Sequence, residues 1–177
     1  MIRFENISLL EADVDYICHQ VNCMGKMNSG VAKAIRERWP IVFTTYQAYY
    51  NQNTKNGGNT LLGDILFVNP NDYEPKTWPE SPIIINMFGQ FGYGYDGKRY
   101  TSYDGFDNCL QKIKEIVPKD RKLAFPYKIG CDRGGADWEV IFPMIKNQLS
   151  DYNIVFCYLT PDDWLKENVI DIEWRDK

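Results

Sequence analysis

Two glycine-rich segments carry residue types suited to binding phosphate and ribose. The first, HQVNCMGKMNSGVAKAI over residues 19–35, places Asn22, Gly25 and Gly30 between a strand-like and a helix-like stretch. Glycine lets a backbone approach a bulky ligand, and free N–H groups at a helix start favour an anion. The amides of Asn22 and Asn28 can bind ribose hydroxyls or orient a water. An ordinary glycine turn explains the same pattern, because the segment matches neither GxGxxG nor the phosphate loop of nucleotide triphosphatases.

The second segment, PYKIGCDRGGADW over residues 126–138, also joins a strand-like stretch to a helix-like one. Its glycines Gly130, Gly134 and Gly135 would let several amides converge on phosphate oxygens. Arg133 could add a charge-assisted contact. Two glycine loops before two helix starts fit a diphosphate with one loop on each side, and two unrelated turns are the alternative.

A further segment, NMFGQFGYGYDGKRY over residues 86–100, is rich in glycine and aromatic residues. That composition predicts a mobile wall or lid beside a ligand. The alternative is a flexible surface loop with exposed tyrosines, since loops lie at the surface whether or not they bind.

Three side chains near these loops are candidates for acid–base chemistry. His19 is the only histidine and can act as an acid or a base near neutral pH. Asp132 and Asp137 belong to the second segment, and either carboxylate could activate a water. Each candidate has a structural alternative: a packed strand residue for His19, a solvated loop acid for Asp132, and a helix N-cap for Asp137. We interpret Cys23 and Cys131 as small lining residues, because no histidine other than His19 could activate their thiols.

The elements that must position these residues alternate between strands and helices. Runs of apolar residues predict strands, and apolar residues at helical spacing predict helices. Thr101 and Asp104 fit a capping box before one helix, and Pro143 predicts a kink or a later start in another. The alternation predicts an α/β layered domain with a largely parallel central sheet, whose ligands lie beyond the carboxyl ends of the strands. The predicted strands are 2–4, 16–22, 64–69, 83–90, 122–126 and 153–159, and the predicted helices are 31–39, 40–50, 103–117 and 138–149.

Composition narrows the class of protein. The 177 residues suit a single domain over residues 1–177, and 44% hydrophobic residues are typical of a globular protein. A net charge of −4 argues against general nucleic-acid binding. No stretch approaches the ~20 apolar residues of a membrane span, and acids within the N-terminal apolar stretch argue against a secretory signal. Five scattered cysteines with one histidine predict a reduced, cytoplasmic protein without a zinc site.

Together these segments resemble the macro domain family. VNCMGKMNSGVAKAI is similar to the family's first ribose-binding loop, and IGCDRGGADW is similar to its glycine-rich diphosphate loop. INMFGQFGYG followed by YTSYDGF resembles the branch that contains ADP-ribose-1''-phosphate phosphatases and terminal ADP-ribose glycohydrolases. The resemblance runs from Ile2 to about Trp164. It implies a three-layer α/β/α sandwich with a mixed sheet and an ADP-ribose cleft.

The resemblance also implies an activity and a set of partners. The activity is hydrolysis at the distal ribose, of a phosphate monoester or an ADP-ribosyl linkage. The alternatives are an ADP-ribose-binding module without turnover and a nucleotide-binding α/β domain outside this family. The expected partners are ADP-ribose, ADP-ribose-1''-phosphate and an ADP-ribosylated macromolecule. We expect a cytoplasmic monomer that needs no cofactor, no metal and no membrane.

The same resemblance implies roles for individual residues. A phosphatase of this branch has a histidine implicated in catalysis at the place of His19, and some glycohydrolases use a lysine nucleophile, which Lys98 matches if a gap is allowed. Many members bind the adenine amine with the Asp of a Gly-Asp-Ile stretch. The matching stretch here is Glu5-Asn6-Ile7, so Asn6 must supply that contact or it is lost. The expected catalytic residues are His19, Asp132, Asp137 and Lys98, and the expected ligand-binding residues are Asn6, Ile7, Asn22, Gly25, Asn28, Ser29, Gly30, Val31, Ile129, Gly130, Cys131, Arg133, Gly134, Gly135, Ala136 and Tyr158.

Overall fold

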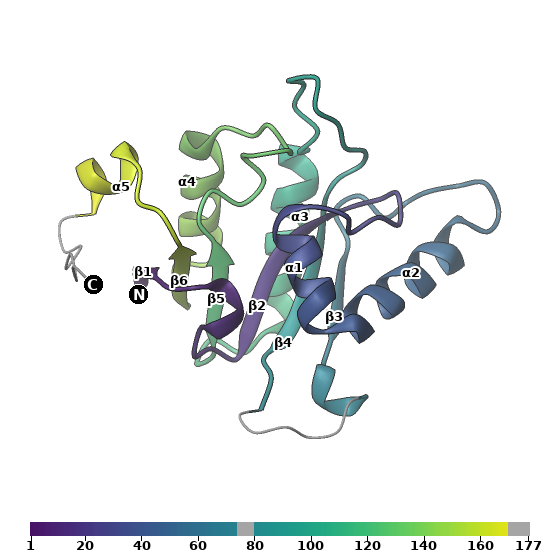
Figure 1. Ribbon diagram of the computed structural model, residues 1–177, viewed down its shortest axis with the longest axis horizontal. Coiled ribbons are helices and arrows are strands. Elements are labelled where there is room, and N and C mark those ends of the chain that lie inside the picture. The colour runs from purple at the N-terminus through teal and green to yellow at the C-terminus, as the bar shows by residue number, and fades with distance from the viewer. Residues whose placement is uncertain (74–79, 170–177) are drawn as a thin grey trace.

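The computed structural model describes residues 1–73 and 80–169 (Figure 1). Its six strands are β1 (Ile2–Asn6), β2 (Tyr16–Asn22), β3 (Ile65–Val68), β4 (Ile83–Gln90), β5 (Lys122–Pro126) and β6 (Asn153–Tyr158). They form one mixed sheet in the order β1–β6–β5–β2–β4–β3. Within the described ranges all neighbouring strands pair in parallel except β3, which pairs antiparallel with β4.

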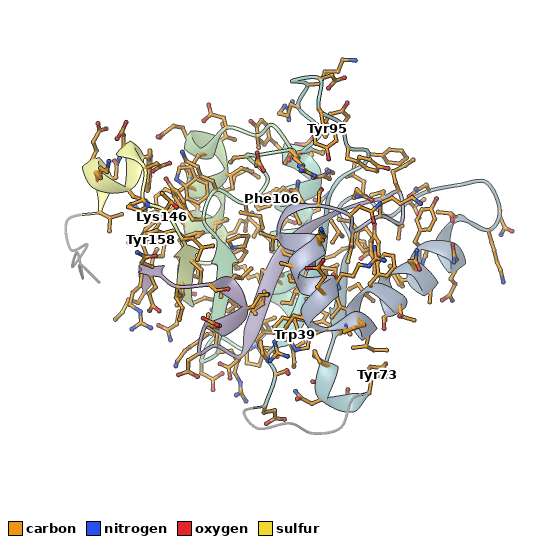
Figure 2. All side chains as sticks on the ribbon, viewed as in Figure 1. Trp39, Tyr73, Tyr95, Phe106, Lys146 and Tyr158 are labelled. Atoms are coloured by element: carbon orange, nitrogen blue, oxygen red, sulfur yellow. The ribbon has the colours of Figure 1, made fainter. Side chains whose placement is uncertain are left out.

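Helices cover both faces of the sheet. α1 (Gly30–Arg38) and α2 (Pro40–Thr54) pack on one face, and α3 (Tyr103–Ile116) and α4 (Trp138–Gln148) pack on the other (Figure 1). Successive strand residues point to opposite faces. Ile17 of β2 therefore packs with α1 and α2, whereas Cys18 belongs to the core under α3 and α4. Phe106 of α3, labelled in Figure 2, is part of that same core. The predicted three-layer α/β/α sandwich is confirmed.

Shorter helical segments complete the described chain. A short helix, α5 (Asp163–Asn168), places Trp164 against Phe4 of β1, with ring centroids 5.8 Å apart. No helix in residues 1–73 and 80–169 is long and apolar enough to cross a bilayer. Two 3₁₀ turns add to these elements, η1 (Leu9–Glu11) and η2 (Pro70–Asp72).

The predicted strands and helices all form, and β2, β4 and β5 have the predicted ends. One local prediction is wrong: the N-cap of α3 is Ser102, whose hydroxyl accepts from Gly105 N, whereas Thr101 is buried one residue earlier. Of the kink or later start predicted at Pro143, the later start does not occur, because α4 already begins at Trp138 and continues past the proline.

Parallel pairing brings five strand ends to one edge of the sheet. The loops after β2, β4 and β5 are the three glycine-rich segments, so this edge gathers them as the strand–helix alternation predicts. We call residues 22–30 the first loop, residues 91–100 the tyrosine loop and residues 127–137 the second loop. The last residues of β1, β6, β5, β2 and β4 are Asn6, Tyr158, Pro126, Asn22 and Gln90.

Candidate functional site

Two adjoining cavities lie at the carboxyl edge of the sheet. One, the loop cavity, has a volume of about 360 Å³ and lies between the first and second loops. The other, the apolar cavity, has a volume of about 390 Å³ and lies beside the ends of β1 and β6. Gly30, Val31, Pro126 and Tyr127 line both cavities. The two cavities therefore form one continuous cleft.

The first loop is shaped by Asn22. Its Oδ1 accepts from the N–H groups of Met24 (3.0 Å) and Lys26 (3.3 Å), and its Nδ2 donates to Lys26 O (2.8 Å). Gly25 has φ +72°, and a Cβ there would lie 2.9 Å from the Tyr50 ring. Asn22 borders the loop cavity and Gly25 does not. Gly25 therefore serves the packing of the loop against α2.

The N-terminus of α1 faces the loop cavity. Ser29 is the N-cap of α1, and Ser29, Gly30 and Val31 all line the cavity. The first N–H groups of a helix have no partner within it, and together with the helix dipole they favour an anion. Asn28 lines the cavity as well, with its Oδ1 accepting from Arg36 Nη1 at 3.0 Å. This wall of the cleft therefore offers several hydrogen-bond donors to a ligand.

The second loop supplies a matching set of donors. Within the described residues, the backbone N–H groups of Gly130, Asp132, Arg133 and Gly134 have no hydrogen-bond partner. All four residues line the loop cavity. Gly130 has φ +76°, a conformation that favours glycine. The cleft is thus bordered by backbone donors on two sides, which is the arrangement that the two glycine loops predict.

Besides Gly25 and Asn6, three residues of the second loop that were expected to bind a ligand lie outside the lining of both cavities. Cys131 is only partly exposed, and burial raises the pKa of its thiol to about 12. A Cβ at Gly135 would lie 2.8 Å from Lys98 O, so this glycine allows the second loop to approach the tyrosine loop. Ala136 is buried in the core under α4. Ile129 does border the loop cavity.

The apolar cavity is lined by residues of the segment that follows β1, of α1 and of the end of β6. Tyr158, at the end of β6, is 6% exposed, and burial raises the pKa of its phenol (Figure 2). Asn6 does not line the cavity. In the amide orientation that suits its neighbours, the side-chain nitrogen of Asn6 donates to the carbonyls of Tyr158 (3.1 Å) and Leu159 (3.2 Å), which joins the ends of β1 and β6. The lining includes Ile7, Leu9, Leu10, Val31, Ala34, Tyr158 and Leu159.

His19 lies inside the protein and lines neither cavity. It is fully buried, and its Nε2 is 2.7 Å from Asn86 Oδ1. Burial lowers the pKa of its imidazole from 6.5 to about 4. Alternation along β2 turns His19 toward the α1 and α2 face with Ile17, whereas Gln20 points the other way. The structure thus gives His19 the packed position of the structural alternative, because an imidazole buried here does not reach a ligand in the cleft.

Of the other expected catalytic residues, Asp132 alone borders the loop cavity, and it is the only carboxylate of the described chain that does so. Asp137 is the N-cap of α4, and its Oδ1 accepts a backbone N–H at 2.9 Å. Lys98 is exposed outside the lining, with its Nζ 3.5 Å from Asp96 Oδ2. Cys23 is buried, and burial raises the pKa of its thiol to about 12. Nowhere in the described ranges do three or more His, Cys, Asp or Glu side chains gather to hold a metal ion.

Several lining residues escaped sequence reasoning. Gln20 and Gln90 line the loop cavity, and Gln20 Nε2 donates to Gln90 Oε1 at 2.7 Å. Tyr127 and Lys128 also line it, and both contact the carboxylate of Asp162 before α5. Lys128 is the only non-glycine residue with positive φ (+56°) in the described chain. The available signal is position, since Gln90 ends a strand and Gln20 lies two residues before a strand end, where ligands approach parallel sheets.

The tyrosine loop forms a further wall of the loop cavity, lined by Tyr93 and Tyr95. Tyr95 is 78% exposed and lies on the loop that projects beyond α3 (Figure 2). The Arg133 guanidinium lies 4.6 Å from the centroid of the Tyr95 ring, within the range of a cation–π interaction. The tyrosine loop therefore reaches the second loop at the mouth of the cavity.

No family model matches the chain. Among solved structures, the macrodomain of Mycobacterium tuberculosis DarG is 26% identical and superposes with a TM-score of 0.68, and the match covers 92% of this chain and 99% of that one. The chain is therefore similar in fold and sequence to macrodomains. The resemblance predicted from the glycine-rich loops is therefore confirmed at the level of the family.

Two further comparisons concern this macrodomain. It is 27% identical over 140 residues to the DNA ADP-ribosyl glycohydrolase of Mycobacterium tuberculosis, a match that covers 78% of this chain and 36% of that protein. The chain thus spans about a third of the length of this curated relative. Thermosipho africanus DarTG, solved in complex with ADP-ribose, superposes with a TM-score of 0.73 at 17% identity, over 93% of this chain and 44% of that one. At that identity the likeness shows the shared fold.

Proposed function

We propose that this macrodomain binds ADP-ribose along the whole cleft and hydrolyses a bond at the distal ribose, releasing ADP-ribose from a modified macromolecule. The observation that carries the proposal is the continuity of an apolar cavity with a second cavity bordered by backbone donors on two sides. ADP-ribose has its groups in the same order: a flat purine, a diphosphate and a terminal ribose. A similar protein named a DNA ADP-ribosyl glycohydrolase and a similar structure that holds ADP-ribose support this assignment.

In the proposed complex, the adenine occupies the apolar cavity between Val31 and Tyr158. The diphosphate lies between the N-terminus of α1 and the second loop, where the unpaired N–H groups donate to its oxygens. Hydrogen bonds to an anion are shorter and stronger than neutral ones, and Arg133 adds a positive charge at this position. The distal ribose then lies next to Gln20 and Gln90, at the end of the cleft away from the adenine.

Asp132 is the residue we propose to orient or deprotonate the attacking water. It is the one carboxylate in the described lining, and a positioned general base contributes ~10²–10⁴ in rate. Water oxygen bonds to the anomeric carbon of the distal ribose, and the bond from that carbon to the acceptor breaks with its electron pair on the acceptor atom. The water proton passes to the carboxylate and then to the acceptor. His19 and Lys98 take no direct part in this proposal, because neither lines the cleft.

Recognition of ADP-ribose without turnover is the second candidate. One observation favours it: the described lining of the cleft contains a single carboxylate and no histidine. Hydrolysis of ADP-ribose-1''-phosphate would use the same cleft and the same carboxylate. The three activities therefore differ in turnover and substrate and share the binding mode.

Calorimetry and a turnover assay test the proposal. ADP-ribose should bind more tightly than adenosine, because adenosine leaves the donors of both loops unused. Turnover is measured with ADP-ribosylated DNA, an ADP-ribosylated protein and ADP-ribose-1''-phosphate. Asp132→Asn should lower turnover by ~10²–10⁴ while ADP-ribose still binds. Asp137→Asn is the matched control, since it lies on the same loop outside the cleft and Asn still caps a helix.

The outcomes separate the candidates. Full turnover by Asp132→Asn would reject its catalytic role. Tight binding of ADP-ribose with no turnover of any of the three substrates would favour recognition alone. Failure to bind ADP-ribose would reject both candidates.

A further inference from the structure

Thr101 joins the tyrosine loop to the second loop. It is 1% exposed and lines neither cavity. Its Oγ1 donates to Gly130 O at 2.9 Å, and the N–H groups of Tyr100 and Thr101 both donate to Gly134 O at 2.9 Å. Tyr100 and Thr101 therefore hold the second loop at Gly130 and at Gly134. The unpaired N–H groups of the loop belong to these two glycines and to residues between them.

Gln20 connects this contact to the rest of the cleft. Its Nε2 donates to Thr101 Oγ1 at 2.9 Å and to Gln90 Oε1 at 2.7 Å. Gln90 pairs with Thr101 in an isolated antiparallel bridge, and its carbonyl accepts from Cys23 N of the first loop at 3.1 Å. The side chains of Gln20, Gln90 and Thr101 thus lie in one hydrogen-bonded chain between the two loops.

Glycines leave the space that these side chains occupy. A Cβ at Gly89 would lie 2.5 Å from Gln20 Oε1, and a Cβ at Gly134 would lie 2.3 Å from Thr101 Oγ1. Real Cβ atoms essentially never show contacts this short. A Cβ at Gly130 would lie 3.1 Å from Gln20 Oε1 and 3.2 Å from Thr101 Oγ1. Glycines that the sequence associates with a phosphate therefore also make room for Gln20 and Thr101.

We infer that Gln20 and Thr101 form a clamp that positions the second loop for the diphosphate. The inference rests on the proposed function. Thr101 is buried away from the cleft, so it acts through the loop: it holds Gly130 and Gly134, and the free N–H groups of Asp132 and Arg133 lie between these two residues. Thr101 is a positioning residue, and Gln20 combines that role with a place in the cleft lining.

A hydroxyl deletion with a matched control tests the clamp. Thr101→Val removes the hydroxyl and keeps the branched shape, whereas Thr101→Ser keeps the hydroxyl. ADP-ribose affinity should fall about five- to tenfold in Thr101→Val, the size of one or two lost hydrogen bonds, and stay within about twofold in Thr101→Ser. Adenosine affinity should not change, because the apolar cavity does not contact the clamp. Exchange of the hydrogen-bonded amides of the second loop, those of Cys131, Gly135 and Ala136, should accelerate in Thr101→Val and not in Thr101→Ser.

A second variant covers the case in which Thr101→Val fails to fold. Gln20→Met keeps the length of the side chain and removes its amide, so it should show the same acceleration of exchange at Cys131, Gly135 and Ala136. Both changes remove the hydrogen bond between Gln20 and Thr101. The double variant should therefore bind ADP-ribose only slightly more weakly than whichever single variant binds it less tightly.

Two results would overturn the clamp: unchanged ADP-ribose affinity in Thr101→Val and Gln20→Met, or unchanged exchange at Cys131, Gly135 and Ala136 in both. If the unaltered protein binds no ADP-ribose, the proposed function fails by itself. The exchange rates then still decide whether Gln20 and Thr101 hold the loop, since they need no ligand.

Discussion

The first and second loops border one cleft, but different parts of the chain hold them in place. Asn22 holds the first loop through bonds to the backbone within that loop, and Tyr46 of the neighbouring α2 adds a further bond. The second loop is held by Gln20 of β2 and by Thr101 before α3. The first loop is therefore supported mostly by its own backbone and by α2, apart from the bond from Cys23 N to Gln90 O. Gly130 and Gly134 of the second loop are instead held by Thr101, which is distant in the sequence.

This difference predicts how each loop responds to change. Donors of the first loop belong to the start of α1, and a helix keeps its N–H groups aligned when one neighbouring contact is lost. Donors of the second loop depend on a few hydrogen bonds from other elements. A change near Thr101 should therefore affect both stability and ADP-ribose affinity, whereas a comparable change near Asn22 should affect stability more than affinity.

Among the substitutions that compare the two loops, Gly134→Ala should cause the largest loss of stability. A Cβ at Gly134 would lie 2.3 Å from Thr101 Oγ1 and 2.4 Å from Gly130 O, so backbone as well as side chain must move. Overpacking costs about 1–3 kcal/mol, and we expect a loss of about 3 kcal/mol in urea unfolding because a backbone atom is involved. ADP-ribose affinity should fall with it.

Gly30→Ala is the control for this change in the first loop. No atom lies within 4 Å of a Cβ at Gly30, so only its φ of +56° opposes alanine. That conformation costs about 1–2 kcal/mol. Equal losses of stability for the two variants would show that the crowding at Thr101 is relieved by a small shift, and the proposed difference in support would be wrong.

β2 shows how far the sequence alone could predict this site. The apolar run over residues 16–22 predicts the strand, and Asn22 before a glycine turn marks the first loop, because these signals are local. Gln20 and Thr101 are 81 residues apart, and no local pattern pairs them. The spacing of Thr101 and Asp104 predicts a capping role for Thr101, which in the structure belongs to Ser102.

The direction in which a side chain points is a second feature of the site that the sequence alone does not predict. A strand alternates between two faces, but a strand buried on both faces carries no pattern that says which face meets a ligand. His19 and Gln20 are neighbours in such a strand. Gln20 lines the cleft and His19 packs against Asn86. The histidine was therefore a reasonable catalytic candidate from its chemistry, and only the fold could place it.

His19→Gln should remove a pH dependence of stability. Burial holds the pKa of His19 near 4 in the folded protein, below its ordinary value of 6.5. Below pH 6.5 the unfolded chain takes up a proton that the folded protein does not, so stability is lost as the pH falls from 6.5 toward 4. The loss between pH 7 and pH 5 should be about 2 kcal/mol, measured as the free energy of unfolding in urea.

The same measurement on Gln20→Met separates the two faces of β2. Gln20→Met should keep the pH dependence and lose ADP-ribose affinity, whereas His19→Gln should lose the pH dependence and keep ADP-ribose affinity at pH 7. A full pH dependence in His19→Gln would assign the effect to another group. A loss of affinity in that variant would bring His19 back to the binding site.

Tyr46→Phe should have the smallest effect and tests the local support of the first loop. Tyr46 is fully buried, and its hydroxyl lies 2.7 Å from Asn22 O and accepts from Lys26 N at 3.1 Å. Loss of the hydroxyl should cost about 1 kcal/mol in urea unfolding. ADP-ribose affinity should change less than about twofold, because the bonds from Asn22 to Lys26 remain and the donors belong to α1.

Tyr49→Phe is the control on the same helix. The hydroxyl of Tyr49 donates to Asp64 Oδ2 at 2.5 Å, away from either loop, so its loss should lower stability and leave ADP-ribose affinity unchanged. Calorimetry with ADP-ribose on both tyrosine variants, beside Thr101→Val, completes the test. If Tyr46→Phe lowers ADP-ribose affinity as much as Thr101→Val does, the first loop depends on its neighbours to the same degree as the second, and the contrast between a locally supported and a remotely supported loop fails.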